Sequence, residues 1–448
     1  DKYQLTVYDG EYHTPRWFGE GITYNIFPDR FCRDKAPEQP EGEGVIPRVL
    51  HQNWDDIPVY LPDEHGEILN NDFFGGTLRG VYAKLDYLES LHVTTIYFNP
   101  IFQAYSNHRY DTGDYKRIDP LLGCEEDFRA LCSEAARRGM RVVLDGVFNH
   151  TGYDSRYFNA RGHYDSVGAF QSKESPYFSW FDFHNWPNEY GSWWGIYTLP
   201  QVNETDGSYQ DYIIEDEDSV VRHWLRLGAT GWRLDVAADL GNSREYNHQF
   251  WKKFRKAVKE ANPEAVILAE NYGDSYDWLQ GDEWDTIMNY DAFMEPVTWF
   301  LTGMQKHSDE FRQDMLGNAG NFFGAMHHNM SRMGGQAVAI SMNELSNHDH
   351  SRFLTRTNHR VGRTASVGAE AANEGINKAV FMEAVIIQMT WPGAPTIYYG
   401  DEAGVCGWTD PDNRRTYPWG SEDQELIAFH KAAIAMHKSQ EVLKTGSY

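Results

Sequence analysis

The sequence predicts an α/β fold: a (β/α)8 TIM barrel with an inserted subdomain after its third strand. Short apolar stretches alternate with amphipathic segments along the 448 residues, the pattern of parallel βα units. Several of these stretches end in acidic residues, and TIM-barrel active sites are built at the C-terminal ends of the strands. The interval between His150 and Ser219 is long, rich in aromatic residues and without a clear helix, which indicates an insertion.

Each expected strand is a short run of β-branched or aliphatic residues, and each expected helix follows with apolar residues at helical spacing. The strands are expected at 21–27, 94–99, 141–145, 231–235, 265–270, 286–289, 338–343 and 395–399. The helices are expected at 78–92, 125–138, 219–227, 247–262, 376–390 and 424–440, with weaker signals near Trp278 and over 295–316.

These elements divide the chain into three parts. Residues 16–146 and 213–448 are expected to form the catalytic barrel, and residues 147–212 the inserted domain. Residues 1–15 are expected to precede the barrel as a linker or as the remnant of a further domain. Because the chain starts without Met and stops abruptly, we expect additional domains in the full-length protein.

Composition limits the partners. A formal charge of −26 argues against nucleic acid and anionic membranes, and no apolar run approaches the ~18 residues of a membrane span. The chain has 15 Trp and 27 Tyr, which is many for a barrel of this size. Most of these rings are expected to pack in the core and at interfaces, and the remainder could line a binding groove. The location is left open, with the cell exterior or surface slightly favoured over the cytoplasm.

An acid pair at strand ends predicts glycoside hydrolysis, which uses one carboxylate as nucleophile and one carboxylic acid as proton donor. Arg233 and Asp235 lie two apart on one strand and point the same way, so the guanidinium should keep Asp235 ionised. Glu270 follows five apolar residues, and burial should leave it protonated as a general acid. The alternatives are a structural Arg–Asp ion pair and a structural Glu.

Further polar residues follow other strands. His348 and Asp349 could bind sugar hydroxyls or simply form a turn. His150, in Asp145-Gly146-Val147-Phe148-Asn149-His150, could contact a hydroxyl while Asp145 and Asn149 hold loops. The sequence has no His-Glu-x-x-His or Cys-x-x-Cys spacing, so no metal residue is assigned.

Four segments, containing Asp145 to His150, Gly231 to Val236, Glu270, and Asn347 to Asp349, resemble in order and spacing the four short motifs of the α-amylase family of glycoside hydrolases. Asn99 to Thr112 and Leu199 to Asn203 resemble its neopullulanase, cyclomaltodextrinase and amylopullulanase branch. Tyr3 to Thr14 resembles the closing stretch of the N-terminal β-domain of that branch, so the resemblance implies that residues 1–15 are a remnant of an N-terminal β-domain.

The resemblance implies a role for each matching residue. Asp235 would be the nucleophile, Glu270 the acid/base and Asp349 the stabiliser of the transition state. Tyr110 would stack on the sugar at the cleavage site, which His150, Arg233 and His348 would contact. Asp410 and Arg414 resemble the pair that holds the next sugar toward the non-reducing end.

Some positions depart from the family pattern. Members with a calcium loop carry Asn and Asp after the first strand, where this chain has Arg33, Asp34 and Lys35, and an Asp where it has Thr77. We therefore expect no required cofactor, with Ca²⁺ as a disfavoured alternative.

The sequence thus predicts a retaining α-glucan hydrolase. It would cleave α-1,4 bonds of starch, pullulan or maltooligosaccharides through a covalent β-glucosyl-enzyme intermediate. Val236, after the nucleophile, resembles members that also accept α-1,6 bonds. The alternatives are a transglycosylase or isomerase that uses the same intermediate and, more distantly, a non-catalytic carbohydrate-binding barrel.

Overall fold

The computed structural model describes residues 10–446. The expected N-terminal remnant therefore lies largely outside the described residues, as do Ser447 and Tyr448 at the end of the expected barrel range.

Eight parallel strands form the central sheet, in the order β12-β11-β10-β7-β4-β1-β14-β13. A parallel bridge between Met288 and Met342 joins the two outer strands and closes the barrel. The predicted (β/α)8 fold is confirmed. The strands are β1 (Thr23–Ile26), β4 (Thr95–Phe98), β7 (Arg141–Gly146), β10 (Gly231–Leu234), β11 (Val266–Ala269), β12 (Thr286–Ile287), β13 (Met342–Glu344) and β14 (Ala394–Tyr398).

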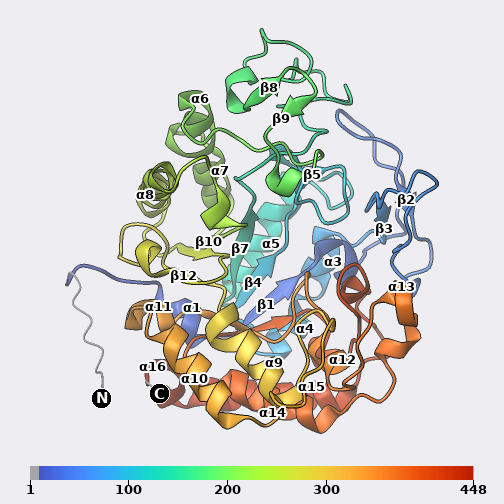
Figure 1. Ribbon diagram of the computed structural model, residues 1–448, viewed down its shortest axis with the longest axis vertical. Coiled ribbons are helices and arrows are strands. Elements are labelled where there is room, and N and C mark those ends of the chain that lie inside the picture. The colour runs from blue at the N-terminus through green and yellow to red at the C-terminus, as the bar shows by residue number, and fades with distance from the viewer. Residues whose placement is uncertain (1–9, 447–448) are drawn as a thin grey trace.

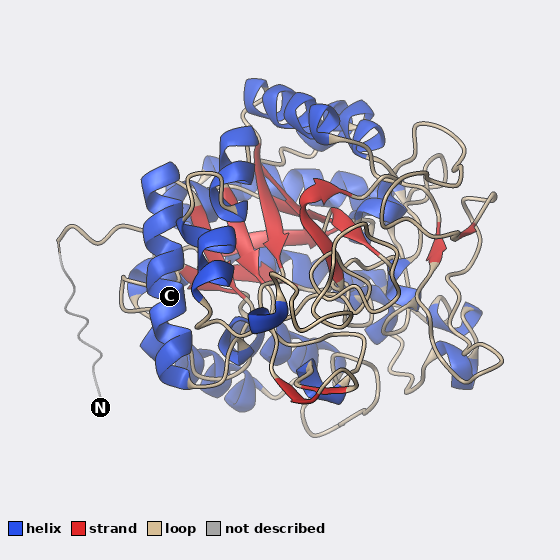
Figure 2. Ribbon diagram, turned by 90° about the horizontal axis from the view of Figure 1, so that it is seen from above, coloured by secondary structure: helices blue, strands red, loops and turns tan. Residues whose placement is uncertain are grey.

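Helices surround these strands (Figure 2). The main ones are α3 (Leu78–Ala83), α4 (Leu85–Ser90), α5 (Glu125–Arg137), α7 (Val220–Leu227), α8 (Arg244–Ala261), α9 (Glu295–Thr302), α10 (Ala319–Met330), α14 (Lys378–Thr390) and α15 (Gln424–Ser439). Shorter helices are α1 (Arg16–Glu20), α2 (Pro28–Phe31), α11 (Gly335–Val338), α12 (Phe353–Arg356), α13 (Thr364–Val367) and α16 (Glu441–Thr445). Among the described residues, no helix is long and apolar enough to cross a bilayer.

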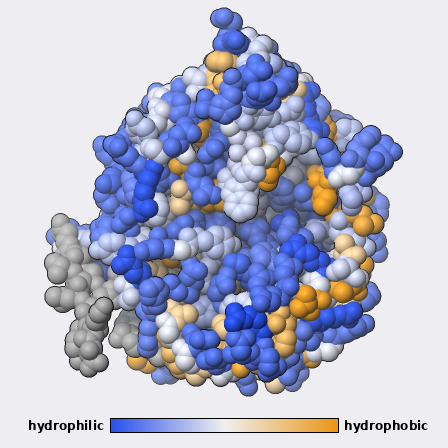
Figure 3. Space-filling model, viewed as in Figure 1, coloured by the Kyte–Doolittle hydropathy of each residue, from blue (hydrophilic) through white to orange (hydrophobic). Residues whose placement is uncertain are grey.

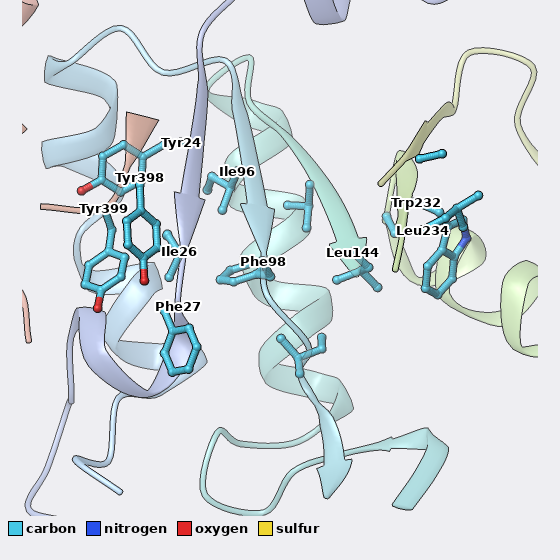
Figure 4. Close-up of a cluster of buried hydrophobic side chains, with 14 of the residues drawn as sticks. Tyr24, Ile26, Phe27, Ile96, Phe98, Leu144, Trp232, Leu234, Tyr398 and Tyr399 are labelled. Atoms are coloured by element: carbon cyan, nitrogen blue, oxygen red, sulfur yellow. The ribbon is translucent and has the colours of Figure 1, made fainter. Parts of the chain in front are cut away.

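Side chains that alternate between the two faces of each strand pack into two apolar clusters. Ile96, Phe98 and Leu144 point outward and pack beneath the helices, as Figure 4 shows for this cluster. Their strand neighbours Tyr97 and Val143 point into the barrel and belong to a smaller inner cluster. Because successive side chains of a strand face opposite sides, the inner positions at the C-terminal strand ends are left for the site.

Loops after the strands build one face of the molecule. The insert between β7 and α7 lies at the top of Figure 1 and holds β8 (Phe183–Asn185), β9 (Glu189–Tyr190) and α6 (Gly207–Gln210), which runs on into a π-helical turn (Asp211–Glu215). The pairs β2 (Val49–Leu50) with β3 (Asp72–Phe73), and β5 (Phe102–Ala104) with β6 (Thr112–Ile118), lie in the loops after β1 and β4.

Three predicted elements differ from the structure. The helix expected at 78–92 breaks at Lys84, which has non-helical backbone angles (φ −105°, ψ 9°). The strand expected from Val338 begins only at Met342, because α11 occupies the preceding residues. The helix expected over 295–316 ends at Thr302, before Gly303 in the left-handed region (φ 63°). The sequence reasoning also missed α10, whose two glycines lower its helix propensity but whose Phe322 and Met326 are buried.

Candidate active site

Strand register brings the predicted acids together. Arg233 on β10 pairs with Asp145 on β7. The backbone N–H groups of Asp235 and Glu270 each donate to the preceding strand in the barrel, at 3.0 and 2.9 Å. Their side chains therefore emerge side by side at the C-terminal ends of β10 and β11. Figure 3 shows that the face of the molecule seen in Figure 1 is hollowed below the insert.

The guanidinium of Arg233 holds three carboxylates. Its Nη1 donates to Asp145 Oδ1 at 2.8 Å and to Asp235 Oδ1 at 2.9 Å, and its Nη2 lies 2.9 Å from Glu270 Oε2. The Arg233 side chain has no exposed surface. The guanidinium therefore contacts the three acids from inside the barrel, and its contact with the sugar at the cleavage site stays a prediction.

Sharing this guanidinium changes the electrostatics of Asp235. Burial raises the pKa of Asp235 well above the usual aspartate range; Arg233 opposes the shift, and the carboxyls of Glu270 and Asp145 add to it. Arg233 therefore favours the ionised form of Asp235, as its place on the strand predicts, but its one positive charge is shared among three acids.

Each oxygen of Glu270 has its own surroundings. Oε2 lies against Arg233 and accepts the backbone N–H of Val236 at 3.1 Å, whereas Oε1 accepts the Tyr290 hydroxyl at 3.1 Å. Val236 has φ 39°, which a β-branched residue rarely adopts, and this strained backbone directs its N–H to the acid. The two oxygens of Glu270 are thus held from different sides, Oε2 by cationic and backbone N–H groups and Oε1 by a hydroxyl.

Tyr110 is one of three tyrosines whose hydroxyls contact these acids, with Tyr97 on Asp145 and Tyr290 on Glu270. Its hydroxyl donates to Asp145 Oδ2 at 2.7 Å and accepts an N–H of Asn99 at 3.1 Å. Its ring stacks on His348, with centroids 5.0 Å apart and 16° between the planes, and lies 5.8 Å from the Arg233 guanidinium. The half-buried ring is therefore held by partners on three sides.

Replacing Tyr110 tests whether the ring acts in catalysis. A cationic transition state over an aromatic face gains about 0.5–2 kcal/mol. Tyr110→Ala is therefore expected to lower kcat/KM at least about tenfold, near 1.4 kcal/mol. Tyr110→Phe keeps the ring but leaves Asp145 without one donor, so we expect a smaller loss, of a few-fold. Kinetics and melting curves of both variants measure this. If activity falls only with the folded fraction, the ring is structural.

His150 and His348 are both neutral. Burial lowers the pKa of His150 to about 4, and burial, with Arg233 and Arg414 nearby, lowers that of His348 well below its usual value. His348 Nδ1 lies 3.0 Å from the Asn99 amide nitrogen, so Nδ1 accepts and Nε2 carries the hydrogen. By the same argument, His150 Nδ1 accepts from the Asn149 amide, and His150 Nε2–H donates to the Tyr110 carbonyl at 3.1 Å. A sugar hydroxyl that binds His150 would have to share this Nε2–H with the carbonyl.

Asp349 lies in the loop after β13, and 38% of its side chain is exposed. Burial of its surroundings raises its pKa to about 7, with Glu270 adding to the shift and Arg414 opposing it. Arg414 Nη2 lies 3.7 Å from Asp349 and 3.8 Å from Asp410, and its Nε donates to the His348 carbonyl at 2.9 Å. The structure thus joins all nine predicted site residues in one network, with half-exposed Asp410 at its outer edge.

The sequence analysis did not predict two residues that lie behind these acids, Asn347 and Glu344. The Asn347 amide N–H₂ donates to Glu344 Oε1 at 2.8 Å and reaches the Tyr290 hydroxyl at 3.4 Å. The side-chain Oδ1 of Asn347 accepts the backbone N–H groups of Asp349 and His350 at 3.0 and 3.1 Å. Asn347 therefore connects the loop of Asp349 with the partner of Glu270. Its place in the Asn-His-Asp segment was the available signal, but nothing local identified Glu344.

Glu344 gives the site a pH-dependent stability. Burial raises its pKa to about 8. Since the unfolded chain releases this proton near the ordinary pKa of about 4.3, the stability of the fold decreases as pH rises from there to about 8. Glu344→Gln removes this dependence, so its Tm should exceed that of the wild type by a margin that grows between pH 5 and 8. Melting curves across this range measure the margin, with exposed Glu374→Gln as control. A margin independent of pH contradicts the buried-proton account.

The loop after β1 does not fit a calcium ion. Arg33 donates to the Gln52 carbonyl at 3.1 Å, Lys35 adds a second positive charge, and Asp34 accepts the Thr77 hydroxyl at 2.8 Å. Calcium takes six to eight oxygen ligands, and this loop offers cations instead. Among the described residues, no group of three or more His, Cys, Asp or Glu side chains could hold a metal ion.

The protein has a barrel fold, acids at the C-terminal ends of its strands and a guanidinium shared by these acids. These features define its class as a carbohydrate-cleaving barrel enzyme. The family model "Alpha amylase, catalytic domain" matches residues 25–444. The chain therefore belongs to the α-amylase family of glycoside hydrolases.

Relatives place it in the predicted branch. The chain is 38% identical to an amylopullulanase of Thermoanaerobacterium saccharolyticum, over 99% of this chain and 36% of that protein. It is 34% identical to neopullulanase 2 of Thermoactinomyces vulgaris, over 97% and 65%. The type III pullulan hydrolase of Thermococcus kodakarensis has a similar structure, with a TM-score of 0.78 at 29% identity, covering 97% of this chain and 72% of that one.

The chain is shorter than these relatives. It spans between 25% and 36% of the length of three amylopullulanases, and about two thirds of neopullulanase 2.

Proposed function

We propose that this domain is a retaining α-glucan hydrolase that cleaves α-1,4 bonds in maltooligosaccharides and pullulan, with α-1,6 bonds as a second target. The observation that carries the proposal is the pair Asp235 and Glu270, held by one buried guanidinium. The names of the relatives support the substrate class, and Val236 after the nucleophile supports the α-1,6 activity.

Asp235 attacks the anomeric carbon while Glu270 gives a proton to the leaving oxygen. The bond from carbon to that oxygen breaks, and a β-linked glucosyl ester forms on Asp235. Glu270, now ionised, takes a proton from water, and the water oxygen displaces Asp235 with a second inversion. Asp349 accepts hydroxyl hydrogens of the flattened ring, and the Tyr110 face lies beside its developing positive charge.

The product anomer tests this mechanism. Proton NMR during the first minutes of maltotriose hydrolysis should show the α-anomer before mutarotation. An initial β-anomer contradicts the retaining mechanism. The carboxyl separation of a retaining pair is about 5–5.5 Å, which a complex with a bound inhibitor can measure.

Transglycosylation is the second candidate, because an acceptor sugar can replace water at the same intermediate. Products at high maltose concentration separate the two: longer oligosaccharides indicate transfer, and glucose alone indicates hydrolysis. We also propose that no calcium is required, since the loop after β1 offers Arg33 and Lys35. Dialysis against EDTA should then leave kcat/KM and Tm unchanged.

A further inference from the structure

Two tryptophans of the insert extend the site toward solvent. The Trp193 ring stacks on His150, with centroids 5.7 Å apart and planes at 27°. The Trp194 ring stacks in turn on Trp193, at 5.3 Å and 30°. His150 is 1% exposed and Trp194 is 81% exposed. A continuous row of rings therefore leads from a buried residue of the catalytic site to the surface.

The loop that carries these rings is fixed at both ends. A bridge between Ser192 and Pro200 closes its base. The Trp193 indole N–H donates to Asp239, four residues beyond Asp235, at 3.1 Å. On the other side, the Tyr197 hydroxyl reaches Glu67, in the segment between β2 and β3, at 3.4 Å. The loop is thus tied to segments from two different parts of the chain.

Holding Trp194 outward has a free-energy cost. Its backbone lies in the left-handed region (φ 52°, ψ 24°), which is unfavourable for a non-glycine residue. Its ring also leaves apolar surface in water, which burial elsewhere would remove. Neither cost is offset within the described residues by burial of the ring, which indicates that a ligand covers it.

We propose that Trp194, backed by Trp193, is a platform on which a glucose unit of the α-glucan stacks, beyond the unit held at the cleavage site. The apolar face of a pyranose matches a flat indole, and a neutral chain is not repelled by the acidic domain. The continuity of the ring row with His150 favours a sugar chain that already occupies the site. This inference rests on the proposed function.

Binding to an enzyme that cannot turn over tests the platform. In the Asp235→Asn background, isothermal titration compares maltoheptaose, which is long enough to reach beyond the site, with maltotriose. Trp194→Ala should weaken maltoheptaose binding about fivefold more than maltotriose binding, the effect of uncovering one sugar face. Trp194→Phe keeps part of the flat surface and should lose less. Tyr82→Ala removes another exposed ring, on α3, and should change neither affinity.

The outcomes are distinguishable. Equal weakening of both sugars would mean that the ring acts through His150 at the cleavage site, and unchanged affinity for both would mean that no sugar covers it; either result overturns the platform. If neither sugar binds even with Trp194 intact, the proposed function itself fails. Melting curves of each variant exclude loss of folding as the cause.

Discussion

Asp235→Asn should lower kcat/KM at least about a thousandfold on maltotriose, pullulan and activated aryl glucosides alike, because no covalent intermediate can form without the carboxylate. The asparagine oxygen can still accept from Arg233, which now donates to Asp235 at 2.9 Å. The fold should therefore persist. Because burial raises the pKa of Asp235, the amide also removes a costly buried charge, and Tm should stay level or rise.

Initial rates on the three substrates and a melting curve test this expectation. Asp314→Asn, which removes an exposed carboxylate paired with Arg312, is the matched control and should be fully active. If Asp235→Asn retained more than about one per cent of the activity on any substrate, Asp235 would not be the nucleophile. A large loss of Tm would point instead to a structural ion pair with Arg233.

The order of strands and helices could be predicted because each element has a local pattern of apolar and polar residues. Runs such as residues 265–270 are short, apolar and end in an acid, and they became β11 with Glu270 at its end. Errors arose where packing overrides local preference. The residues of α10 include two glycines, which lower its helix propensity, but burial of Phe322 and Met326 stabilises the helix.

Site chemistry was harder to predict, since it depends on which strands are neighbours. The sequence placed Arg233 beside Asp235, but not Asp145 and Glu270 against the same guanidinium, because those strands come from distant segments. Register within the barrel therefore decides the charge that each acid feels. The row of rings from His150 to Trp194 was hidden for another reason: the insert has no periodic pattern from which its loop geometry could be inferred.

Glu270→Gln should separate substrates by their leaving groups. General acid catalysis contributes about 10²–10⁴-fold, so kcat/KM on maltotriose should decrease by that factor. α-Maltosyl fluoride needs little proton donation, so its kcat/KM should change less than about tenfold. The glutamine oxygen can still accept the Val236 N–H, which now donates to Oε2 at 3.1 Å. The amide NH₂ can donate to the Tyr290 hydroxyl, which now donates to Oε1 at 3.1 Å, so the strand end should keep its position.

The second half of the reaction gives an independent readout. Without Glu270 as base, water attacks the intermediate slowly, so kcat should fall for the fluoride even where kcat/KM does not. Azide needs no base, and it should restore kcat and release glycosyl azide. Equal losses of kcat/KM on both substrates, with no effect of azide, would contradict Glu270 as the acid/base. The role would then pass to another carboxyl of the cluster, and Asp349, whose pKa is raised to about 7, would be the first to replace.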